Sequence, residues 1–488
     1  MPKIQVSRCM STQHPDNVNS PFFADTEVLA GETEIKEAYY VFSHLNIREQ
    51  MWDCEGKEVD NHVVEKLLTR YPQFFSENRL GKDVYLTLRV PNPSVEKTQG
   101  KILLETLETI PRNYDIAAAT GSDVAPVWEI ILPMCTSSEQ LERVYEYYKK
   151  IVVGKRTAMV AGISVAEWVG EFSPSEISVI PLVEDRKSLT EADKIVGEFI
   201  KQRKPEYQRV FLARSDPALN YGSLAAVLLN KLCLQKLHQL QEETSIEILP
   251  IIGVGSAPFR GNLKPTNVQN CLREYPSVQT FTLQSSYKYD YPESVVRSGN
   301  EEINETRRRS PLHVDEDTIS AIVDKTISQY QKEVEALSPL ISILAKYVPS
   351  RRSRKLHIGL FGYARSVKGI SLPRAIPFCA ALYSIGLPPE LLGLSALTEK
   401  ELDRVRTLYI AFDEDISDST KYICKENLAR LPHDIGKQIM SVISHFDCQI
   451  DQDYSEAAKE VMDIALSDNR ANLTDAIMKT AWKRNFLG

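Results

Sequence analysis

The sequence lacks the features that mark several large classes of protein. It has no apolar run long enough to span a membrane, and its first thirty residues hold no apolar signal core. Its net charge of −8 gives no basic excess of the kind that attracts nucleic acid or anionic membranes. Its eight cysteines are scattered without a C-x-x-C pair, which argues against a zinc site or a disulfide framework. We therefore expect a cytoplasmic protein with reduced thiols and no nucleic-acid or membrane partner.

The chain also lacks internal repeats and low-complexity linkers. Its 488 residues suffice for a large core, in two domains or in one elaborated barrel. Up to about residue 290, short stretches rich in Val and Ile alternate with amphipathic segments, which favours a parallel sheet, open or closed into a barrel. The expected strands lie at 83–90, 176–185, 207–216, 247–256 and 278–286, and the expected helices between them at 191–204 and 221–240.

The sequence pattern changes from mixed strand and helix to helix alone at about residue 316. Residues 317–348 are typical of one long helix or a helix pair, and the last hundred residues are predicted to be all-helical. One further strand, LHIGLFGYA, is expected at 356–364.

Charged residues close successive predicted strands, at the edge where a parallel barrel builds its active site. Single carboxylates from separate strands suit Mg²⁺ or Mn²⁺, with the other positions left to water and substrate oxygens. Convergent arginines suit phosphate or carboxylate. The pattern predicts a small phosphorylated carboxylic acid bound with a divalent metal, although helix capping and surface ion pairs are plainer explanations. The residues concerned are Arg89, Glu184, Asp185, Arg214, Asp216, Arg260 and Arg365.

A second basic cluster spans residues 351–378. Its first part, RRSRK, is typical of a solvated face, as is the RRR at 307–309. Arg365 instead follows an apolar stretch, and Arg374 precedes AIPFCAALYSIGL, which is apolar enough to be a buried helix. An arginine at the mouth of a buried element is the better anion ligand.

A polar stretch, MSTQHPDN at 10–17, places His14 before the first expected element. It is too polar for a core strand and too broken for a helix. Pro15 favours an extended backbone at His14, and Asp16 and Asn17 favour a turn. We expect His14 on a rigid loop, either as a plain surface residue or as an acid–base group that titrates near neutrality.

Together these segments resemble the phosphoenolpyruvate carboxylases, most closely the short archaeal-type form. The similar segments occur in the family's order from residue 12 to residue 488. STQHPDN is similar to the family's TAHPTE, LTLRVPNPS to LDLRQxS, IPLVEDRKSLTEA to PLFETLDDL, ARSDPALNYG to GYSDSxKDxG, GVGSAPFRGN to GRGGTVGRGG, GYARSVKGISLPRAIPF to GSRPAKRxxxxxxxxLRAIPW, and the final RNFLG to RNTG.

The resemblance implies a fold, a reaction and a set of site residues. The implied fold is an elaborated (β/α)₈ TIM-type barrel with many extra helices, in a homotetramer. We expect a single domain over 1–488, with barrel strands mainly within 80–370 and a helical region over about 375–488. The implied reaction is phosphoenolpyruvate plus bicarbonate to oxaloacetate and phosphate, through carboxyphosphate and a metal-bound enolate. The implied roles are catalysis for His14 and Arg260, substrate binding for Arg89, Arg365 and Arg374, Mg²⁺ or Mn²⁺ binding for Glu184 and Asp216, and a C-terminal effector site for Asn485.

Two positions depart from the family pattern. Val254 stands where the glycine-rich loop carries its first arginine, and Leu219 stands where the family has a lysine. Arg214 and Lys264 are candidate substitutes for these charges. The tail KRNFLG carries apolar residues after an amphipathic helix, so we expect Asn485 and the tail to pack near Arg260 at the barrel mouth.

Two other functions fit parts of the pattern. One is a different magnesium-dependent barrel enzyme of pyruvate enolate chemistry, such as an aldolase, a lyase or a phosphonomutase. The other is a non-catalytic anion-binding scaffold that uses the basic segment 351–374. Turnover of phosphoenolpyruvate that depends on bicarbonate would separate the first reading from both.

Overall fold

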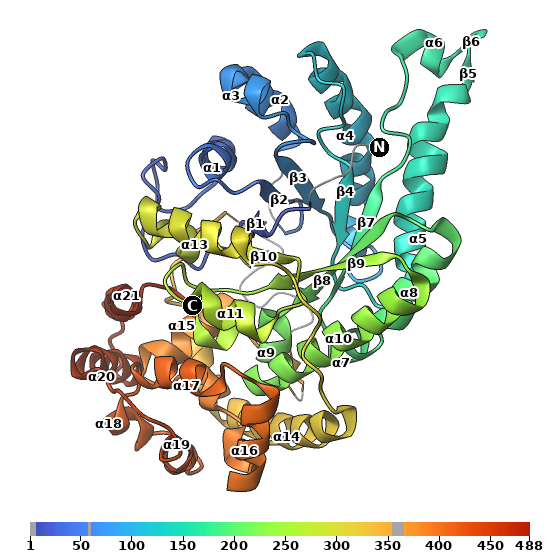
Figure 1. Ribbon diagram of the computed structural model, residues 1–488. Helices are drawn as coiled ribbons and strands as arrows, with labels where there is room; N and C mark the ends of the chain where they lie inside the picture. The colour runs from blue at the N-terminus through green and yellow to red at the C-terminus, as the bar shows by residue number, and fades with distance from the viewer. Residues whose placement is uncertain (1–5, 57–59, 354–365, 368) are drawn as a thin grey trace.

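Eight parallel strands close into a barrel in the computed structural model, which describes residues 6–56, 60–353, 366–367 and 369–488 (Figure 1). Each strand pairs with its sequence neighbour in the barrel, and the first strand pairs with the last to close the ring. This confirms the predicted barrel. In ring order the strands are β1 (Cys9–Ser11), β2 (Glu49–Asp53), β3 (Tyr85–Arg89), β4 (Glu129–Leu132), β7 (Ser178–Val183), β8 (Tyr207–Ala213), β9 (Glu247–Gly253) and β10 (Thr280–Leu283).

Five of these strands lie where the sequence predicts them, and three were missed. The missed strands are β1, β2 and β4, so the stretch MSTQHPDN begins inside a core strand and the expected range 80–370 leaves out β1 and β2. These strands were missed because tertiary contacts stabilise them: closure of the barrel gives each short strand two hydrogen-bonded neighbours. The expected strand at 356–364 lies outside the described residues.

At the amino-terminal end of the barrel, two of the missed strands each begin with a buried acidic residue. Glu49 begins β2 and Glu129 begins β4, and both pair with Arg209 of β8, at 2.7 and 2.5 Å. Thr87 adds a hydrogen bond of 2.6 Å to Glu49. These partners satisfy groups that would be unfavourable in isolation.

Above this polar layer the barrel interior is apolar. Side chains from six of the strands fill it, which leaves the carboxyl ends of the strands to carry the polar groups. The filling residues are Met10, Met51, Ile131, Ile180, Leu182, Phe211, Ala213 and Ile251.

Helices surround the barrel and connect its strands (Figure 1). The predicted helices at 191–204 and 221–240 are found as α8 and α10. The barrel helices are α1 (Glu32–Ser43), α2 (Val63–Arg70), α3 (Pro72–Glu77), α4 (Gly100–Ala119), α5 (Ser138–Tyr147), α7 (Arg186–Thr190), α8 (Ala192–Arg203), α9 (Ser215–Tyr221), α10 (Ser223–Thr244), α11 (Val268–Glu274), α12 (Ser285–Tyr289) and α13 (Glu293–Glu305).

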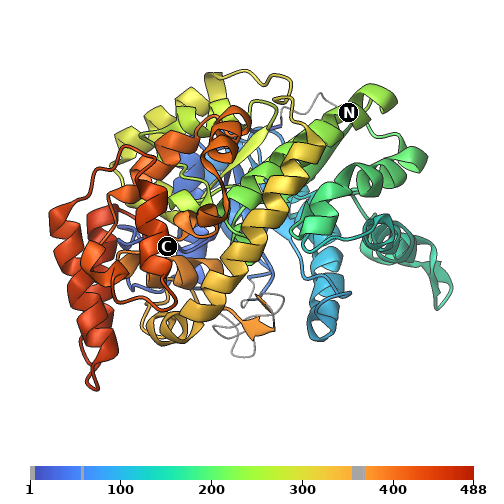
Figure 2. The same ribbon diagram turned by 90° about the horizontal axis from the view of Figure 1, so that it is seen from below.

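The C-terminal helices pack against one side of the barrel (Figures 1 and 2). The long helix predicted at 317–348 is α14, which runs beside α10 and continues the outer layer (Figure 2). Among the described residues after 375, all regular elements are helical, as predicted. The helices from residue 316 onward are α14 (Glu316–Ala345), α15 (Ala375–Ser384), α16 (Glu399–Leu408), α17 (Phe412–Thr420), α18 (Lys425–Leu428), α19 (Ile435–Ile443), α20 (Gln452–Leu466) and α21 (Leu473–Arg484). A small hairpin of β11 (Ser366–Val367) and β12 (Ile370–Ser371) lies between α14 and α15.

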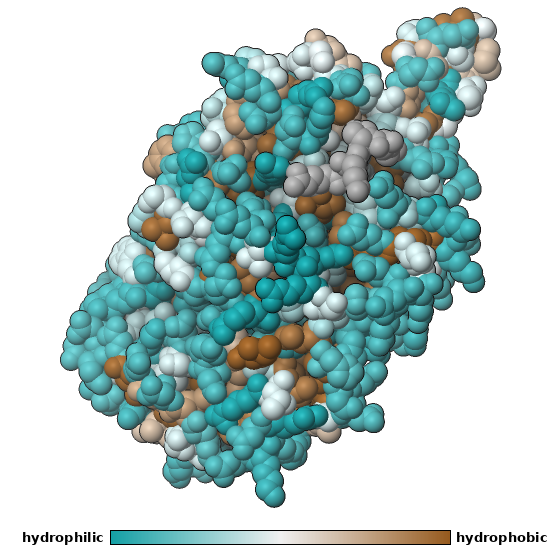
Figure 3. All heavy atoms as spheres, viewed as in Figure 1, coloured by the Kyte–Doolittle hydropathy of each residue, from teal (hydrophilic) through white to brown (hydrophobic). Residues whose placement is uncertain are grey.

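One segment projects away from the barrel. This arm, residues 148–175, carries the hairpin of β5 (Met159–Val160) and β6 (Ile163–Ser164) and then α6 (Val165–Val169) (Figure 1). Several of its apolar side chains face solvent, including Met159 and Trp168, which are 67% and 65% exposed (Figure 3).

Within the described ranges, one bent pair of helical segments has the length and composition that a membrane span requires. No single helix in the described ranges is long and apolar enough to cross a bilayer, whereas Ala375–Ser384 with Pro389–Ala396 passes by length and composition together.

Candidate active site

A cavity of about 590 Å³ opens at the carboxyl ends of the barrel strands. Residues at or just beyond the ends of all eight strands line it, which is the arrangement expected of a barrel active site. Six of the eight predicted site residues share this one cavity, while Arg365 lies outside the described residues and Asn485 lies elsewhere. The six are His14, Arg89, Glu184, Asp216, Arg260 and Arg374.

Glu184 directly follows β7, Asp216 lies in the first turn of α9 after β8, and both line the cavity. A carboxylate oxygen of Glu184 accepts a hydrogen bond of 2.7 Å from the Met134 backbone N–H. Burial raises the pKa of Glu184 to about 8, and the negative charges of Asp216 and Glu55 add to this, whereas Arg89 acts in the opposite direction. Three carboxylates therefore share one buried space.

This carboxylate set fits a hard divalent cation. Across the described ranges, no group of three or more His, Cys, Asp and Glu side chains forms a ready-made metal cage. Mg²⁺ does not need one, because it commonly takes one or two protein carboxylates and fills its other positions with water and substrate oxygens. A cation between Glu184 and Asp216 would also offset the repulsion that raises the pKa of Glu184.

Arg89 is held in the cavity wall by two acidic side chains that the sequence analysis missed. Its Nε and Nη2 donate to the two carboxylate oxygens of Asp53 at 3.0 and 2.6 Å, and Glu55 lies 3.4 Å from Nη2. Burial acts to lower the pKa of Arg89, and these carboxylates outweigh it and raise that pKa. Asp53 ends β2 and Glu55 follows it, so the signal that could have found them was lost with that strand.

His14 lies on the loop after β1, as predicted. Its Nδ1 is 2.9 Å from the hydroxyl oxygen of Thr12. Its carbonyl accepts hydrogen bonds of 3.1 Å from the backbone N–H groups of both Asp16 and Ser285. The loop is thus tied to β1 on one side and to the start of α12 on the other.

Arg260 is buried and its guanidinium is fully engaged by neighbouring groups. Nε donates to the Ser215 hydroxyl at 3.1 Å, and Nη2 donates to the Gln284 side-chain oxygen. Nη1 donates to Asp16 at 3.3 Å and to the Gly488 carbonyl at 2.7 Å. The catalytic candidate is therefore fixed by three loops of the barrel and by the C-terminal residue.

The two departures from the family pattern lie in packed positions. Val254 is buried beneath the loop, where a Cβ on Gly261 (φ 121°) would be 2.6 Å from the Val254 side chain. Leu219 is also buried. Of the two candidate substitutes, Arg214 lines the cavity but donates to the Phe259 carbonyl at 3.1 Å, and Lys264 pairs with Asp418 outside it.

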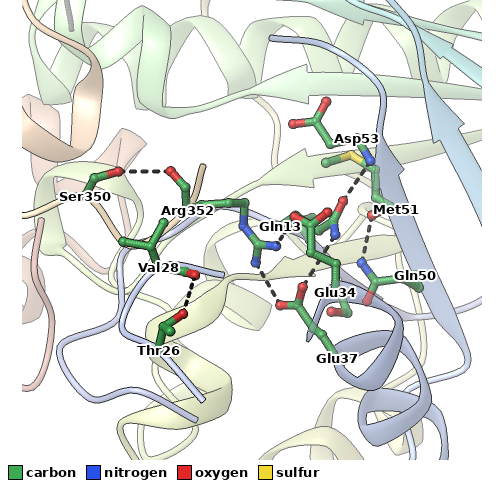
Figure 4. Close-up of polar contacts among 12 residues, drawn as sticks. Gln13, Thr26, Val28, Glu34, Glu37, Gln50, Met51, Asp53, Ser350 and Arg352 are labelled. Carbon is green, nitrogen blue, oxygen red and sulfur yellow. Dashed lines mark hydrogen bonds and ion pairs between the residues drawn. The ribbon is translucent and has the colours of Figure 1, made fainter. Parts of the chain in front are cut away.

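The RRSRK segment is not a solvated face at its start, so that prediction is wrong. Arg351 and Arg352 are 4% and 1% exposed. Arg352 donates to Glu34 at 2.7 Å and to Glu37 at 2.9 Å, two acids of α1 that offset its desolvation (Figure 4). Sequence separations above 300 residues hide this pairing from any local reading. Arg374, at the start of α15, lines the cavity as predicted.

Gln13 connects this buried network to the cavity wall (Figure 4). Its amide nitrogen lies 3.4 Å from Glu37, and its amide oxygen accepts a hydrogen bond of 2.9 Å from the Asp53 backbone N–H. Asp53 in turn holds Arg89, so the position of that arginine depends on Gln13 as well as on Asp53.

The C-terminal tail packs where the sequence predicts it. Phe486 and Leu487 are buried, and the Leu487 N–H donates to the Asp16 carbonyl at 2.7 Å. The Asn485 carbonyl accepts a hydrogen bond of 2.9 Å from Ser286. The contact between Gly488 and Arg260 confirms the predicted packing, while the effector role of Asn485 stays a prediction.

Comparison with known proteins gives this geometry a family. The family model described as phosphoenolpyruvate carboxylase matches residues 6–488. Relatives named phosphoenolpyruvate carboxylase from Methanothermobacter thermautotrophicus and Pyrococcus abyssi are 48% and 50% identical, over 99% of this chain and 100% of their own length. A solved malate synthase magnesium/glyoxylate complex from Haloferax volcanii covers 70% of this chain and 90% of its own, at 10% identity and a TM-score of 0.39, too low for a functional comparison. The full-length match shows that the chain belongs to the phosphoenolpyruvate carboxylase family.

Proposed function

We propose that the chain carboxylates phosphoenolpyruvate with bicarbonate, giving oxaloacetate and phosphate. The observation that carries the proposal is the single cavity lined by His14, Glu184, Asp216 and several arginines. The full-length relatives that bear the enzyme's name support it.

Glu184 and Asp216 would hold Mg²⁺ or Mn²⁺. The cation would supply Lewis-acid stabilisation of developing negative charge and a template for a phosphorylated carboxylic acid.

The arginines serve the first half of the reaction. A bicarbonate oxygen attacks phosphorus, the bond from phosphorus to the enol oxygen breaks, and carboxyphosphate and the pyruvate enolate form. Arg89 and Arg374 face the cavity and spread the charge of the transferring phosphoryl group. Arg365, outside the described residues, is proposed to share this role.

His14 and Arg260 serve the second half. His14 takes the proton of carboxyphosphate, whose C–O bond to phosphate then breaks to give carbon dioxide and phosphate. The enolate carbon attacks carbon dioxide and forms the new C–C bond. Arg260 stabilises the phosphate dianion, and the buried loops keep water from protonating the enolate to pyruvate.

A coupled assay tests the proposal directly. Oxaloacetate formation and phosphate release are measured with bicarbonate present and absent, in Mg²⁺ and after chelation. Formation of oxaloacetate only with both bicarbonate and metal is expected. Turnover without bicarbonate would favour another enolate-forming barrel enzyme, and binding without turnover would favour a scaffold.

The proposed assembly is a homotetramer in the cytoplasm. The exposed apolar side chains of the arm support self-association, because such patches often mark protein contacts (Figure 3). Light scattering measures the mass, and Trp168→Glu on the arm is expected to reduce it. The absence of disulfides among the eight cysteines fits a reducing compartment.

A further inference from the structure

We propose that Asp16 is a positioning residue for the carboxylation half-reaction, which holds His14 and Arg260 in register. The inference rests on the proposed function. It concerns a side chain that the sequence analysis treated only as a turn former.

Asp16 joins four separate parts of the chain. One carboxylate oxygen accepts a hydrogen bond of 2.7 Å from the Ser286 backbone N–H, and the other lies 3.3 Å from Arg260 Nη1. Its N–H donates to the His14 carbonyl at 3.1 Å, and its carbonyl accepts from the Leu487 N–H at 2.7 Å. The loops after β1, β9 and β10 and the C-terminal tail therefore meet at this one residue.

The placement of Asp16 excludes a direct chemical role. It is fully buried and is not part of the cavity lining, whereas its neighbours His14 and Pro15 are. It acts through the groups it holds. Among the described side chains, Asp16 is the one carboxylate that pairs with Arg260. It therefore supplies the negative charge among the groups that orient this guanidinium, which also include Ser215, Gln284 and Gly488.

The consequence is specific to the second half-reaction. The phosphoryl-binding arginine Arg89 and the carboxylate Glu184 make no contact with Asp16 in the described hydrogen bonds and ion pairs. Loss of Asp16 would leave the transfer to bicarbonate in place and misplace the groups that deprotonate carboxyphosphate and hold the phosphate. Enolate that fails to capture carbon dioxide is protonated and leaves as pyruvate.

The test is the product ratio of Asp16→Asn, which keeps the side-chain size and removes the negative charge. Oxaloacetate turnover is expected to fall about 10- to 100-fold, the loss that follows from displacing a catalytic group by about 1 Å. The KM for phosphoenolpyruvate is expected to change less than about threefold. Pyruvate is expected to rise relative to oxaloacetate, measured with lactate and malate dehydrogenases on the same samples.

Asp290→Asn is the matched control. Asp290 is another acid at this junction, and it accepts hydrogen bonds from the Val18 and Asn19 N–H groups at 2.9 and 2.8 Å without touching Arg260. Its variant is expected to lower stability and leave the product ratio unchanged. Adding Asp16→Asn to His14→Asn is expected to change turnover less than it does in the wild type, because both act on one step.

The outcomes separate the two proposals. A wild-type protein that forms no oxaloacetate overturns the proposed function itself. An active wild type whose Asp16→Asn variant keeps its product ratio, at any rate, overturns the positioning role. If thermal unfolding shows that Asp16→Asn does not fold, Asp16→Glu keeps the charge but moves it, and a wild-type ratio in that variant overturns the role equally.

Discussion

Shortening the C-terminus is expected to separate the stability of the tail from its effect on the site. Two deletions form a graded pair. Removal of residues 484–488 takes away the buried Phe486 and Leu487 together with the contact to Arg260. Removal of Gly488 alone takes away mainly the carbonyl that accepts from Arg260.

The two deletions should lower the free energy of unfolding by different amounts. Phe486 packs edge-on against Tyr383 and Tyr422, with ring centroids 5.2 and 5.7 Å apart. Burying a Phe or a Leu side chain stabilises by about 1.5–3 kcal/mol each, so loss of these two side chains alone should lower the free energy of unfolding by about 3–6 kcal/mol in the longer deletion. Loss of the Gly488 carbonyl alone removes one hydrogen bond to a charged group, worth about 1.5–3 kcal/mol.

The assay combines urea unfolding with oxaloacetate formation. Both deletions should lose activity by at least about tenfold, because Arg260 loses the group that orients it. The Gly488 deletion should remain folded in the absence of denaturant. Unchanged kinetics in the Gly488 deletion would show that its contact with Arg260 is incidental. Activity loss only in the longer deletion would reduce the tail to a structural role.

Four further substitutions test the site and its surroundings. Glu184→Gln and Asp216→Asn should keep the fold and lose metal-dependent turnover, so either one active at the wild-type rate in Mg²⁺ would remove that residue from the ligand set. His14→Asn should depress oxaloacetate formation more than bicarbonate-dependent phosphate release, and equal depression of both would place His14 outside the second half-reaction. Burial raises the pKa of Asp415 to about 7, well above its ordinary value of 3.8. The folded state therefore holds a proton there that the unfolded state releases, and this contribution to stability is lost as pH rises from about 4 to about 7. Asp415→Asn should flatten the fall in unfolding free energy over that range, and an unchanged slope in urea titrations would contradict the assignment.

The five strands that could be predicted have recognisable local sequence patterns. The strands at β3, β7, β8, β9 and β10 carry their apolar patterns locally, in runs such as VIPLV and ILPII, so composition alone indicates them. The strands β1 and β2 do not, whereas β4 lies in an apolar run, VWEIILPM, that was missed although it is local. Glu49 and Glu129 belong in the core only because Arg209 lies between them, and that partner is 80 or 160 residues away in sequence. Tertiary context overrides a local pattern here.

The site divides in the same way. The grouping of six residues at one cavity could be predicted, because strand ends and motif resemblance mark them: His14, Arg89, Glu184, Asp216, Arg260 and Arg374. Their partners could not, since nothing near residue 53 or 55 indicates that an acid there will clamp an arginine of the next strand. The wrong reading of RRSRK has the same cause.

Two arginines of the cavity are paired with acidic side chains, which limits the excess positive charge in the cavity. Arg89 lies against Asp53 and Glu55, and Arg260 lies against Asp16. Each guanidinium is thus fixed before substrate arrives and need not reorganise when charge develops, which is how preorganised dipoles and charges lower a barrier. The same acids limit the net positive charge, so affinity for a phosphorylated acid would come largely from a cation held by Glu184 and Asp216. Removing Asp53 should therefore tighten ground-state binding of phosphate while it slows turnover, because Arg89 would gain net charge and lose its direction.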